Sequence, residues 1–308
     1  MEFNHKTVLL NEAVDLLDVK PDGIYIDGTA GGAGHSRLIA SRLGKSGHLY
    51  SLDKDPDAIL VATERLTEYK NATVVETDFS EFDKALAQYG VDSVDGMLLD
   101  LGVSSHQLDK AERGFSYHQD APLDMRMSQK GLSAKDVVNT YDVDTLARIL
   151  REYADEKFAY RIANAIVNKR QQKPIETTLE LAEIVANAVP SAARRDGHPS
   201  RRTFQAIRIA VNGELDCLAT FLDKALGHLK VGGRISIITF HSLEDRMVKH
   251  RFSEWATGCT CPKDFPICVC GKKPKVRLVT RKPIEPTTEQ INDNYRVRSA
   301  KLRVVEKL

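Results

Sequence analysis

The stretch that decides the fold runs from residue 24 to residue 35 and reads IYIDGTAGGAGH. Its apolar start predicts a short buried strand at 24–26, and a helix is expected after the glycines, from about His35 to Leu43. Glycines between a strand and a helix let the backbone approach a bound ligand closely. Their spacing differs from the G-x-G-x-x-G pattern of dinucleotide sites. The stretch therefore predicts a nucleotide-binding turn of another type, with a tight structural turn as the alternative.

Strand and helix signals alternate through the first hundred residues. Further strands are predicted at 48–52, 73–75 and 94–99, and helices are predicted at 56–69 and 82–89. This alternation indicates an α/β fold in which helices cover both faces of a parallel sheet.

Acidic residues follow the predicted strands at the point where each strand ends. They are Asp27, Asp53, Asp78 and Asp100, and Phe79 adds an aromatic ring suited to an adenine. Because ligands bind at the carboxyl edge of such sheets, these side chains are expected to line one site. Asp53 lies about 20 residues past the glycines, where a carboxylate can accept hydrogen bonds from ribose hydroxyls. A row of acids favours a cationic ligand, and the sulfonium of S-adenosylmethionine is one.

The pattern changes in the middle of the chain. Residues 103–130 show no clear period, and residues 133–212 show only helix signals. Ser133 and Asp142 are expected as N-caps, and Thr177 with Glu180 forms a predicted capping box. An all-helical stretch inside an α/β chain predicts an inserted subdomain.

The alternating pattern resumes after this stretch. A helix is predicted at 215–229, a strongly apolar strand at 234–240, and two final strands, expected as an antiparallel pair, at 276–280 and 302–305. We therefore expect residues 1–105 and 213–308 to form an S-adenosylmethionine-binding core, and residues 106–212 to form an inserted, mostly helical substrate-recognition domain.

Composition is typical of a soluble globular protein. Of the 308 residues, 42% are hydrophobic and 28% are charged, and the net charge is +1. No apolar run is long enough to span a membrane, and the first residues do not resemble a secretory signal, so a cytoplasmic location is expected. A nucleic-acid partner would need local basic patches, and two stretches offer them, with a solvated basic face as the alternative. Their residues are Arg194, Arg195, Arg201, Arg202 and Arg208, and Lys272, Lys273, Lys275, Arg277, Arg281 and Lys282.

Four of the five cysteines lie close together: Cys259, Cys261, Cys268 and Cys270. Four thiols within twelve residues can form a tetrahedral zinc site, although C-x-C is a tighter spacing than the usual C-x-x-C. Reduced cysteines without metal are the alternative, because cytosolic chains rarely keep disulfides. Cys217 stands alone in a helical pattern and is expected to pack in the core.

Several long motifs resemble one family from nearly one end of the chain to the other. The chain resembles the RsmH family, also called MraW, of ribosomal RNA small-subunit methyltransferases. The motifs are DGTAGGAGH at 27–35, LLDLGVSS at 98–105, ERGFS at 112–116, PLDMRM at 122–127, RTFQA at 202–206 and FHSLEDR at 240–246.

The resemblance implies a class I, Rossmann-like methyltransferase sheet with an inserted helical subdomain. It implies methylation of the exocyclic N4 amine of cytidine 1402 in 16S rRNA, with the rRNA or the small ribosomal subunit as partner and S-adenosylmethionine as cofactor. Ala33 stands where the family often has Gly, and His106 stands where a Pro is common. The cofactor contacts that it implies are Ala33, Gly34, His35, Asp53, Phe79, Asp100 and Gln107.

The expected chemistry is positioning of a weakly nucleophilic amine against a methyl group. Asp100, or a backbone carbonyl within 101–104, is the expected acceptor for the amine, with a cofactor contact alone as the alternative role of Asp100. Aromatic rings at Phe115, Tyr117 or Phe240 are candidates for stacking on the base. The RNA-side candidates are Arg201, Arg202, Arg208 and His241.

Three other function classes compete with this interpretation. The first is a class I methyltransferase that acts on DNA, protein or a small amine, and the resemblance alone selects RNA. The second is a nicotinamide-dependent oxidoreductase, against which the glycine spacing argues. The third is a non-catalytic RNA-binding module that keeps a nucleotide pocket.

Overall fold

A computed structural model describes residues 7–191, 198–261 and 269–308. The chain forms two compact units, the first from Met1–Gly102 with Leu215–Leu308 and the second from Val103–Glu214. Each unit is described by itself. Arg194, Arg195 and Cys268, which the sequence analysis singled out, lie outside the described residues.

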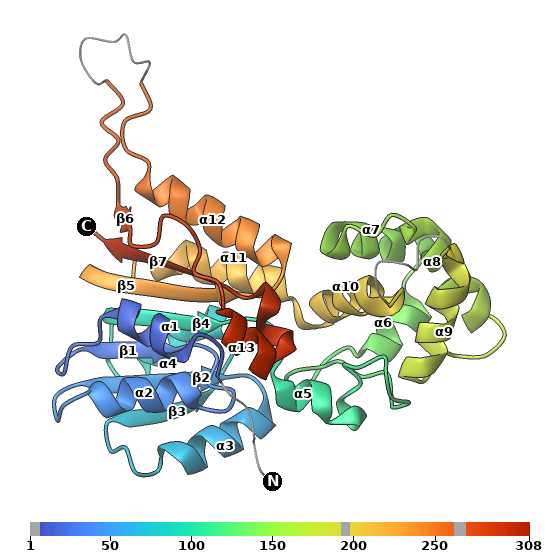
Figure 1. Cartoon of the computed structure of the whole chain (residues 1–308), viewed down its shortest axis with the longest axis horizontal. Coiled ribbons are helices and arrows are strands. Elements are labelled where there is room, and N and C mark those ends of the chain that lie inside the picture. Colours follow the sequence, from blue (N-terminus) through green and yellow to red (C-terminus); the bar gives the residue numbers. More distant parts are fainter. Residues whose placement is uncertain (1–6, 192–197, 262–268) are drawn as a thin grey trace. The chain divides into compact units, whose positions relative to one another are not determined.

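The first unit is built on a seven-stranded sheet of order β3-β2-β1-β4-β5-β7-β6 (Figure 1). The neighbouring pairs from β3 to β5 are parallel, and β7 runs antiparallel to β5 and to β6. The parallel sheet and the antiparallel final pair predicted from sequence are therefore confirmed. The strands are β1 (Ile24–Asp27), β2 (His48–Asp53), β3 (Ala72–Glu76), β4 (Val94–Asp100), β5 (Leu229–Thr239), β6 (Val276–Leu278) and β7 (Lys301–Lys307).

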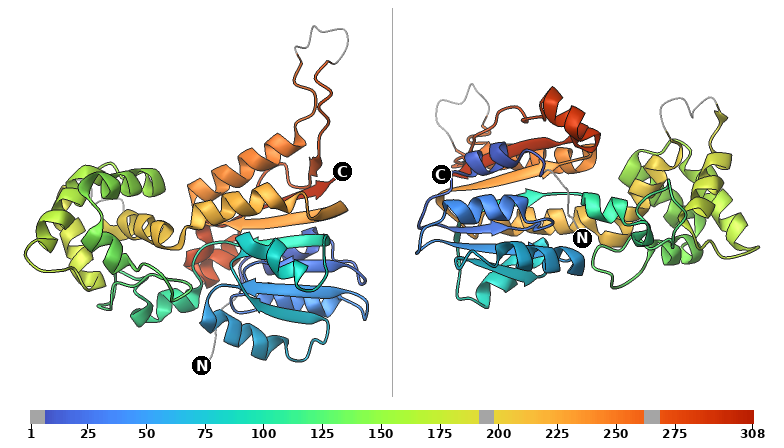
Figure 2. Two further views of the ribbon diagram at one scale, coloured as in Figure 1. Left: turned by 180° about the vertical axis from the view of Figure 1, so that it is seen from behind. Right: turned by 60° about the horizontal axis from the view of Figure 1, so that its bottom comes forward.

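Helices cover both faces of the sheet (Figures 1 and 2). Along β4, Met97 and Leu99 point into one apolar core and Leu98 points into the other, as the two-residue period of a strand requires. Helices α1 (Leu10–Leu17), α2 (Gly34–Arg42) and α3 (Pro56–Leu66) pack on the Leu98 side. Helices α4 (Phe82–Ala87), α11 (Glu214–Ala225) and α12 (Ser242–Ala256) pack on the other.

The structure differs from the sequence predictions at several elements of this unit. Strand β5 begins at Leu229 rather than 234, because Leu229 pairs with Val94 and a register shift joins the two parts of the ladder. Helices α1 and α12 were not predicted. The side chain of His241, an RNA-side candidate from the sequence, caps the first turn of α12. The remaining elements are the short 3-10 helices η1 (Phe79–Glu81) and η4 (Tyr295–Ser299) and the helix α13 (Thr288–Asp293).

The second unit is mostly helical and has its own apolar core. Ser133 caps α6 and Asp142 caps α7, and Thr177 and Glu180 form the capping box of α9, so these three predictions are confirmed. Residues 103–130, which showed no clear period, contain two short helices that were missed, α5 and η2. The helices are α5 (Ser105–Asp109), η2 (Ala111–Arg113), α6 (Ala134–Thr140), α7 (Val143–Ala154), α8 (Ala159–Arg170), α9 (Thr178–Ala188) and α10 (Ser200–Asn212).

None of the helices within the described residues combines the length and the apolar character that crossing a bilayer requires.

Candidate functional site

The carboxyl edge of the parallel strands gathers the acids that follow them. Strand β2, the next strand along the chain, pairs with one edge of β1, and β4 pairs with the other edge of β1. The chain therefore reverses its strand order between β1 and β4, which is the topological switch point where open α/β sheets bind ligands. Asp27 ends β1, and Asp100 ends β4 beside it.

The glycine-rich turn crosses this switch point and is fixed by bonds to its neighbours. The Gly28 N–H donates to the Leu98 carbonyl at 2.9 Å, and the Ala30 N–H donates to the Leu52 carbonyl at 2.8 Å. The Arg65 Nη1 of α3 donates to the Gly32 carbonyl at 2.7 Å. With partners on three elements, the turn is held in one conformation before any ligand binds.

The first turn of α2 follows directly and faces the same edge. Ala33 is the N-cap and lies in the left-handed region, with φ +59°. A glycine, which the resemblance leads us to expect here, would adopt this φ without strain. In this chain an alanine adopts the same left-handed φ. At Gly34, an added Cβ would lie 1.8 Å from Thr7 Oγ1, so no other residue fits without movement of Thr7. Backbone N–H groups in a first helical turn lack partners inside the helix and suit a carboxylate ligand.

Asp53 is oriented by two backbone donors. Its Oδ2 accepts from the Gly31 N–H at 2.8 Å, and its Oδ1 accepts from the Asp55 N–H at 2.9 Å. Burial raises the pKa of Asp53 to about 6. Each carboxylate oxygen has two lone pairs, so Asp53 keeps acceptor capacity for hydroxyl groups while these bonds aim it.

Asp78 is already engaged inside the protein. Its Oδ2 lies 2.9 Å from Lys54 Nζ, and its Oδ1 accepts from the Ser80 N–H at 2.9 Å. Burial alone would raise the pKa of Asp78, but the Lys54 charge and the hydrogen bonds from Ser80 and Lys54 together outweigh this effect, and the net pKa is lowered. The neighbouring Phe79 packs edge-on against Phe221, with ring centroids 5.9 Å apart. Asp78 thus fixes the turn that carries the Phe79 ring.

Asp100 is the acid at the end of β4. Its Oδ1 is buried and has no hydrogen-bond partner among the described residues, and its side chain is 20% exposed. Burial, and then the charges of Asp27 and Glu244, raise the pKa of Asp100 well above its usual value. His35 Nδ1 lies 3.8 Å from Asp100 Oδ2, and His35 Nε2 lies 3.1 Å from the Val8 carbonyl. A buried carboxyl oxygen without a partner indicates a place where a ligand supplies one.

Asp27 was expected at this edge of the sheet, but it is not among the cofactor contacts that the resemblance implies. Asp27 is completely buried. Its carboxylate accepts a hydrogen bond from the Ser36 hydroxyl at 2.6 Å and one from the Thr29 N–H at 3.1 Å. Burial raises its pKa to about 7. The Thr29 hydroxyl in turn accepts from the Asp100 N–H at 2.6 Å. The pattern D-x-T next to a strand end was the available signal, since short polar side chains there bond the turn backbone.

His241 and Glu244 fix the loop after β5. The His241 side chain accepts from the Glu244 N–H, and Glu244 Oε2 accepts from the Phe240 N–H at 2.8 Å. His241 Nε2 lies 3.1 Å from Glu244 Oε1. The first role of His241 is therefore structural, and its contact with RNA stays a prediction.

The remaining cofactor and RNA-side candidates belong to the second unit. Gln107 is buried and completes the capping box of α5, with its Oε1 accepting from the Ser104 N–H at 3.0 Å. Arg201 and Arg202 are exposed at the start of α10. Arg208 is less available, because its Nε and Nη2 donate to the two Glu214 oxygens at 2.8 and 2.9 Å.

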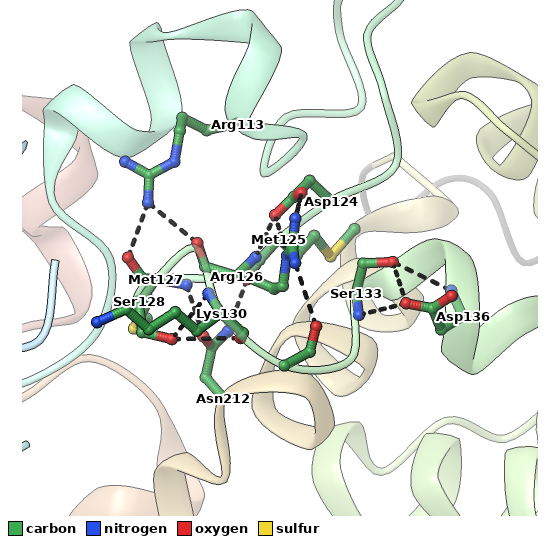
Figure 3. Close-up of polar contacts among 11 residues, drawn as sticks. Arg113, Asp124, Met125, Arg126, Met127, Ser128, Lys130, Ser133, Asp136 and Asn212 are labelled. Carbon is green, nitrogen blue, oxygen red and sulfur yellow. Dashed lines mark hydrogen bonds and ion pairs between the residues drawn. The ribbon is translucent and has the colours of Figure 1, made fainter. Parts of the chain in front are cut away.

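Two of the family-like motifs build one rigid loop in this unit (Figure 3). The buried Arg113 donates through Nη2 to the carbonyls of Arg126 and Met127 at 3.0 and 2.9 Å. Asn212 accepts from the Met127 N–H and donates to the Met125 carbonyl, both at 2.8 Å. Arg126 is paired with Asp124. These bonds explain why long polar motifs stand in a stretch without helical or strand periodicity.

The edge of the first unit fits a nucleoside that carries a positive sulfur. Asp53 can accept ribose hydroxyl protons, the α2 N-terminus can hold a carboxylate, and the unpartnered Asp100 oxygen offers negative charge to a cation. A nicotinamide dinucleotide fits less well, because the turn lacks the spacing that lets a pyrophosphate approach.

Comparison with known proteins decides between these ligands. The MraW methylase family matches residues 2–308. The chain belongs to the MraW methylase family. It is therefore an S-adenosylmethionine-dependent methyltransferase. The competing oxidoreductase interpretation is excluded by this membership.

Curated relatives match the MraW-family chain over its full length. A protein of Lachnospira eligens is 55% identical over 311 residues, covering 100% of this chain and 99% of the relative. A protein of Clostridium botulinum strain Kyoto is 52% identical over 309 residues, with complete coverage of both. Each is named ribosomal RNA small subunit methyltransferase H.

Solved structures are more distant. A putative rRNA methylase of Clostridium thermocellum is 13% identical, covers 99% of this chain and 100% of its own, and has a TM-score of 0.46. A likeness this low says nothing about chemistry.

Proposed function

We propose that this chain transfers a methyl group from S-adenosylmethionine to the N4 amine of cytidine 1402 in 16S rRNA. Two relatives that are more than half identical over their full length carry the name of a small-subunit rRNA methyltransferase. The observation that carries the proposal on the chemical side is the buried, unpartnered Oδ1 of Asp100 at the switch point. The enzyme would then work in the cytoplasm on 16S rRNA or on the small ribosomal subunit.

Six residues of the first unit are proposed to hold the cofactor. Asp53 accepts the ribose hydroxyls, the Phe79 ring contacts the adenine, and the first turn of α2 at 33–35 binds the carboxylate of the methionine part. Asp100 offers its free oxygen to the cationic end. Gln107, in the second unit, is the remaining contact that the resemblance implies.

Asp100 is proposed to serve the amine as well as the cofactor. The bound cofactor supplies a methyl group on a sulfonium sulfur, which departs as a neutral thioether. The exocyclic amine of cytosine is a poor nucleophile because its lone pair is delocalised into the ring. A hydrogen bond from the amine to the Asp100 carboxylate localises that lone pair and accepts the positive charge that develops on nitrogen. The extra proton leaves nitrogen after the C–N bond has formed, so no strong base is needed before attack.

The second unit is proposed to bind the RNA. Arg201 and Arg202 are exposed on the first turn of α10, where they can contact phosphates. Arg208 is seven residues beyond Arg201 and shares its helix face, but it must leave Glu214 to reach a phosphate. A flipped or single-stranded cytidine is required, because a stacked base cannot present its amine to a buried methyl group.

Mass mapping of 16S rRNA from cells with and without this protein tests the proposal. Loss of one methyl group at the expected cytidine, restored by the wild-type chain and not by the Asp100→Asn variant, is the expected result. An unchanged methylation signal in cells without the protein would exclude this target. The alternative, a methyltransferase for another nucleic acid or amine, predicts methyl transfer from labelled cofactor to those substrates instead of small-subunit RNA.

A further inference from the structure

A thin extension leaves the first unit between α12 and β6, and its two arms run side by side (Figure 1). At its base, the Lys275 N–H donates to the Trp255 carbonyl at 2.7 Å. Further out, a Cβ placed on Gly258 would lie 3.2 Å from Pro274 Cδ, so the arms touch there. The described parts are residues 257–261 on the outgoing arm and 269–275 on the returning arm.

Three thiols meet between these arms. Cys259 and Cys261 come from the outgoing arm and Cys270 from the returning arm, and their sulfurs all lie within 4.8 Å of one another. The sulfurs of Cys259 and Cys270 are 3.7 Å apart. Two thiolates on one tetrahedral zinc, at Zn–S distances of about 2.3 Å, are separated by about 3.8 Å. A disulfide would require about 2.05 Å.

The extension has little else to hold the thiols together. Most of its described side chains are exposed, and Val269 is 74% exposed. A segment without an apolar core gains too little from burial to offset the entropy lost when its two arms are ordered. Metal ligation supplies the missing free energy in small segments of this kind.

We propose that Cys259, Cys261 and Cys270 bind one zinc ion and that this ion fastens the two arms of the extension. Each thiol that coordinates loses its proton to solvent, so binding releases protons and no electrons are exchanged. The sequence analysis predicted Cys268 as a fourth ligand, and this residue lies outside the described residues.

Metal analysis of the full-length protein, purified in a reducing buffer with zinc supplied, tests the proposal. We expect about one zinc per chain, retained on gel filtration, and replacement by Co²⁺ should give the visible spectrum of tetrahedral cobalt–thiolate. Cys259→Ser and Cys270→Ser should each lose most of the metal. Cys217→Ser is the matched control and should retain it, because Cys217 lies on α11 beside Asp78.

Two results would overturn the proposal. One is a zinc content near zero, together with reaction of all three thiols with a thiol reagent at the rate that is typical of an exposed cysteine. The other is a Cys259–Cys270 disulfide found by mass spectrometry in metal-free protein. Binding of S-adenosylmethionine by each variant shows that the first unit is folded, so the outcome is independent of the proposed methyl transfer.

Discussion

Three buried carboxyl groups share the carboxyl edge of the sheet, and each has a raised pKa. Burial raises the pKa of Asp27 to about 7 and that of Asp53 to about 6, and it raises the pKa of Asp100 well above its usual value. The protonated form of Asp100 is therefore favoured, relative to that of an ordinary aspartate, when no cation is near. A sulfonium ion beside it would favour the charged form and would lower its pKa.

Binding of S-adenosylmethionine should consequently depend on pH more steeply than binding of S-adenosylhomocysteine. The complex with the cation binds fewer protons than the free protein. The affinity for S-adenosylmethionine therefore rises as pH rises toward the pKa that Asp100 has in the free protein. The rise is up to about tenfold per pH unit when one proton is released. Calorimetry with both ligands between about pH 5.5 and 8 measures this. The neutral thioether has the same amino and carboxyl groups and is the control. Parallel pH profiles for the two ligands would contradict the prediction.

Asp53→Asn should weaken binding of S-adenosylmethionine by about tenfold to a hundredfold, because hydrogen bonds to a charged group contribute about 1.5–3 kcal/mol. The asparagine keeps the size of the side chain but replaces one acceptor oxygen with a donor. Asp22→Asn, an exposed acid before β1, is the control and should bind normally. Equal affinities for both variants would show that Asp53 does not hold the ribose.

At the scale of elements, the site depends on how tightly the turn and α2 are fixed. The turn bonds to β2 and β4 and to Arg65 of α3, and Gly34 lies against Thr7. In the second unit, Arg113 and Asn212 hold the loop around Met125–Met127 in the same manner (Figure 3). Both segments are irregular, and both are fixed by bonds to distant residues rather than by a regular ladder.

Gly34→Ala should therefore lower the affinity for S-adenosylmethionine at least about tenfold. It should also lower the free energy of unfolding by about 1–3 kcal/mol, which is the usual cost of overpacking. The added methyl group meets Thr7 at 1.8 Å and displaces either residue 7 or the start of α2. Thr7→Gly removes the clashing atoms, so the double variant should recover most of both losses. Calorimetry and urea unfolding measure them. A double variant no better than Gly34→Ala would locate the defect elsewhere.

At the scale of the molecule, the two units are proposed to divide the work, the first holding cofactor and the second holding RNA. The whole chain has a net charge of +1, so RNA affinity must come from local cations. Arg201 and Arg202 are exposed on α10, whereas Arg208 is paired with Glu214. The exposed pair should therefore dominate phosphate binding.

The double variant Arg201→Ala with Arg202→Ala should raise the KM for RNA about tenfold at physiological salt and reduce the salt dependence of RNA binding. Its affinity for S-adenosylmethionine should be unchanged. Filter binding at several salt concentrations and cofactor calorimetry give the two readouts. Arg161→Ala, an exposed arginine on α8, is the control. A loss of cofactor affinity, or an RNA affinity equal to that of the control, would contradict this assignment.

The sequence by itself determined the strand–helix alternation, the parallel sheet, three helix caps and the acids at the strand ends, because periodicity and capping act between residues close in the chain. Tertiary structure alone decided what each acid can do. Lys54 pairs with Asp78 at 2.9 Å, while Asp100 Oδ1 has no hydrogen-bond partner among the residues that the structure describes. It also decided that three thiols from two arms meet. Burial and partner choice depend on which segments pack together, and no local pattern encodes that.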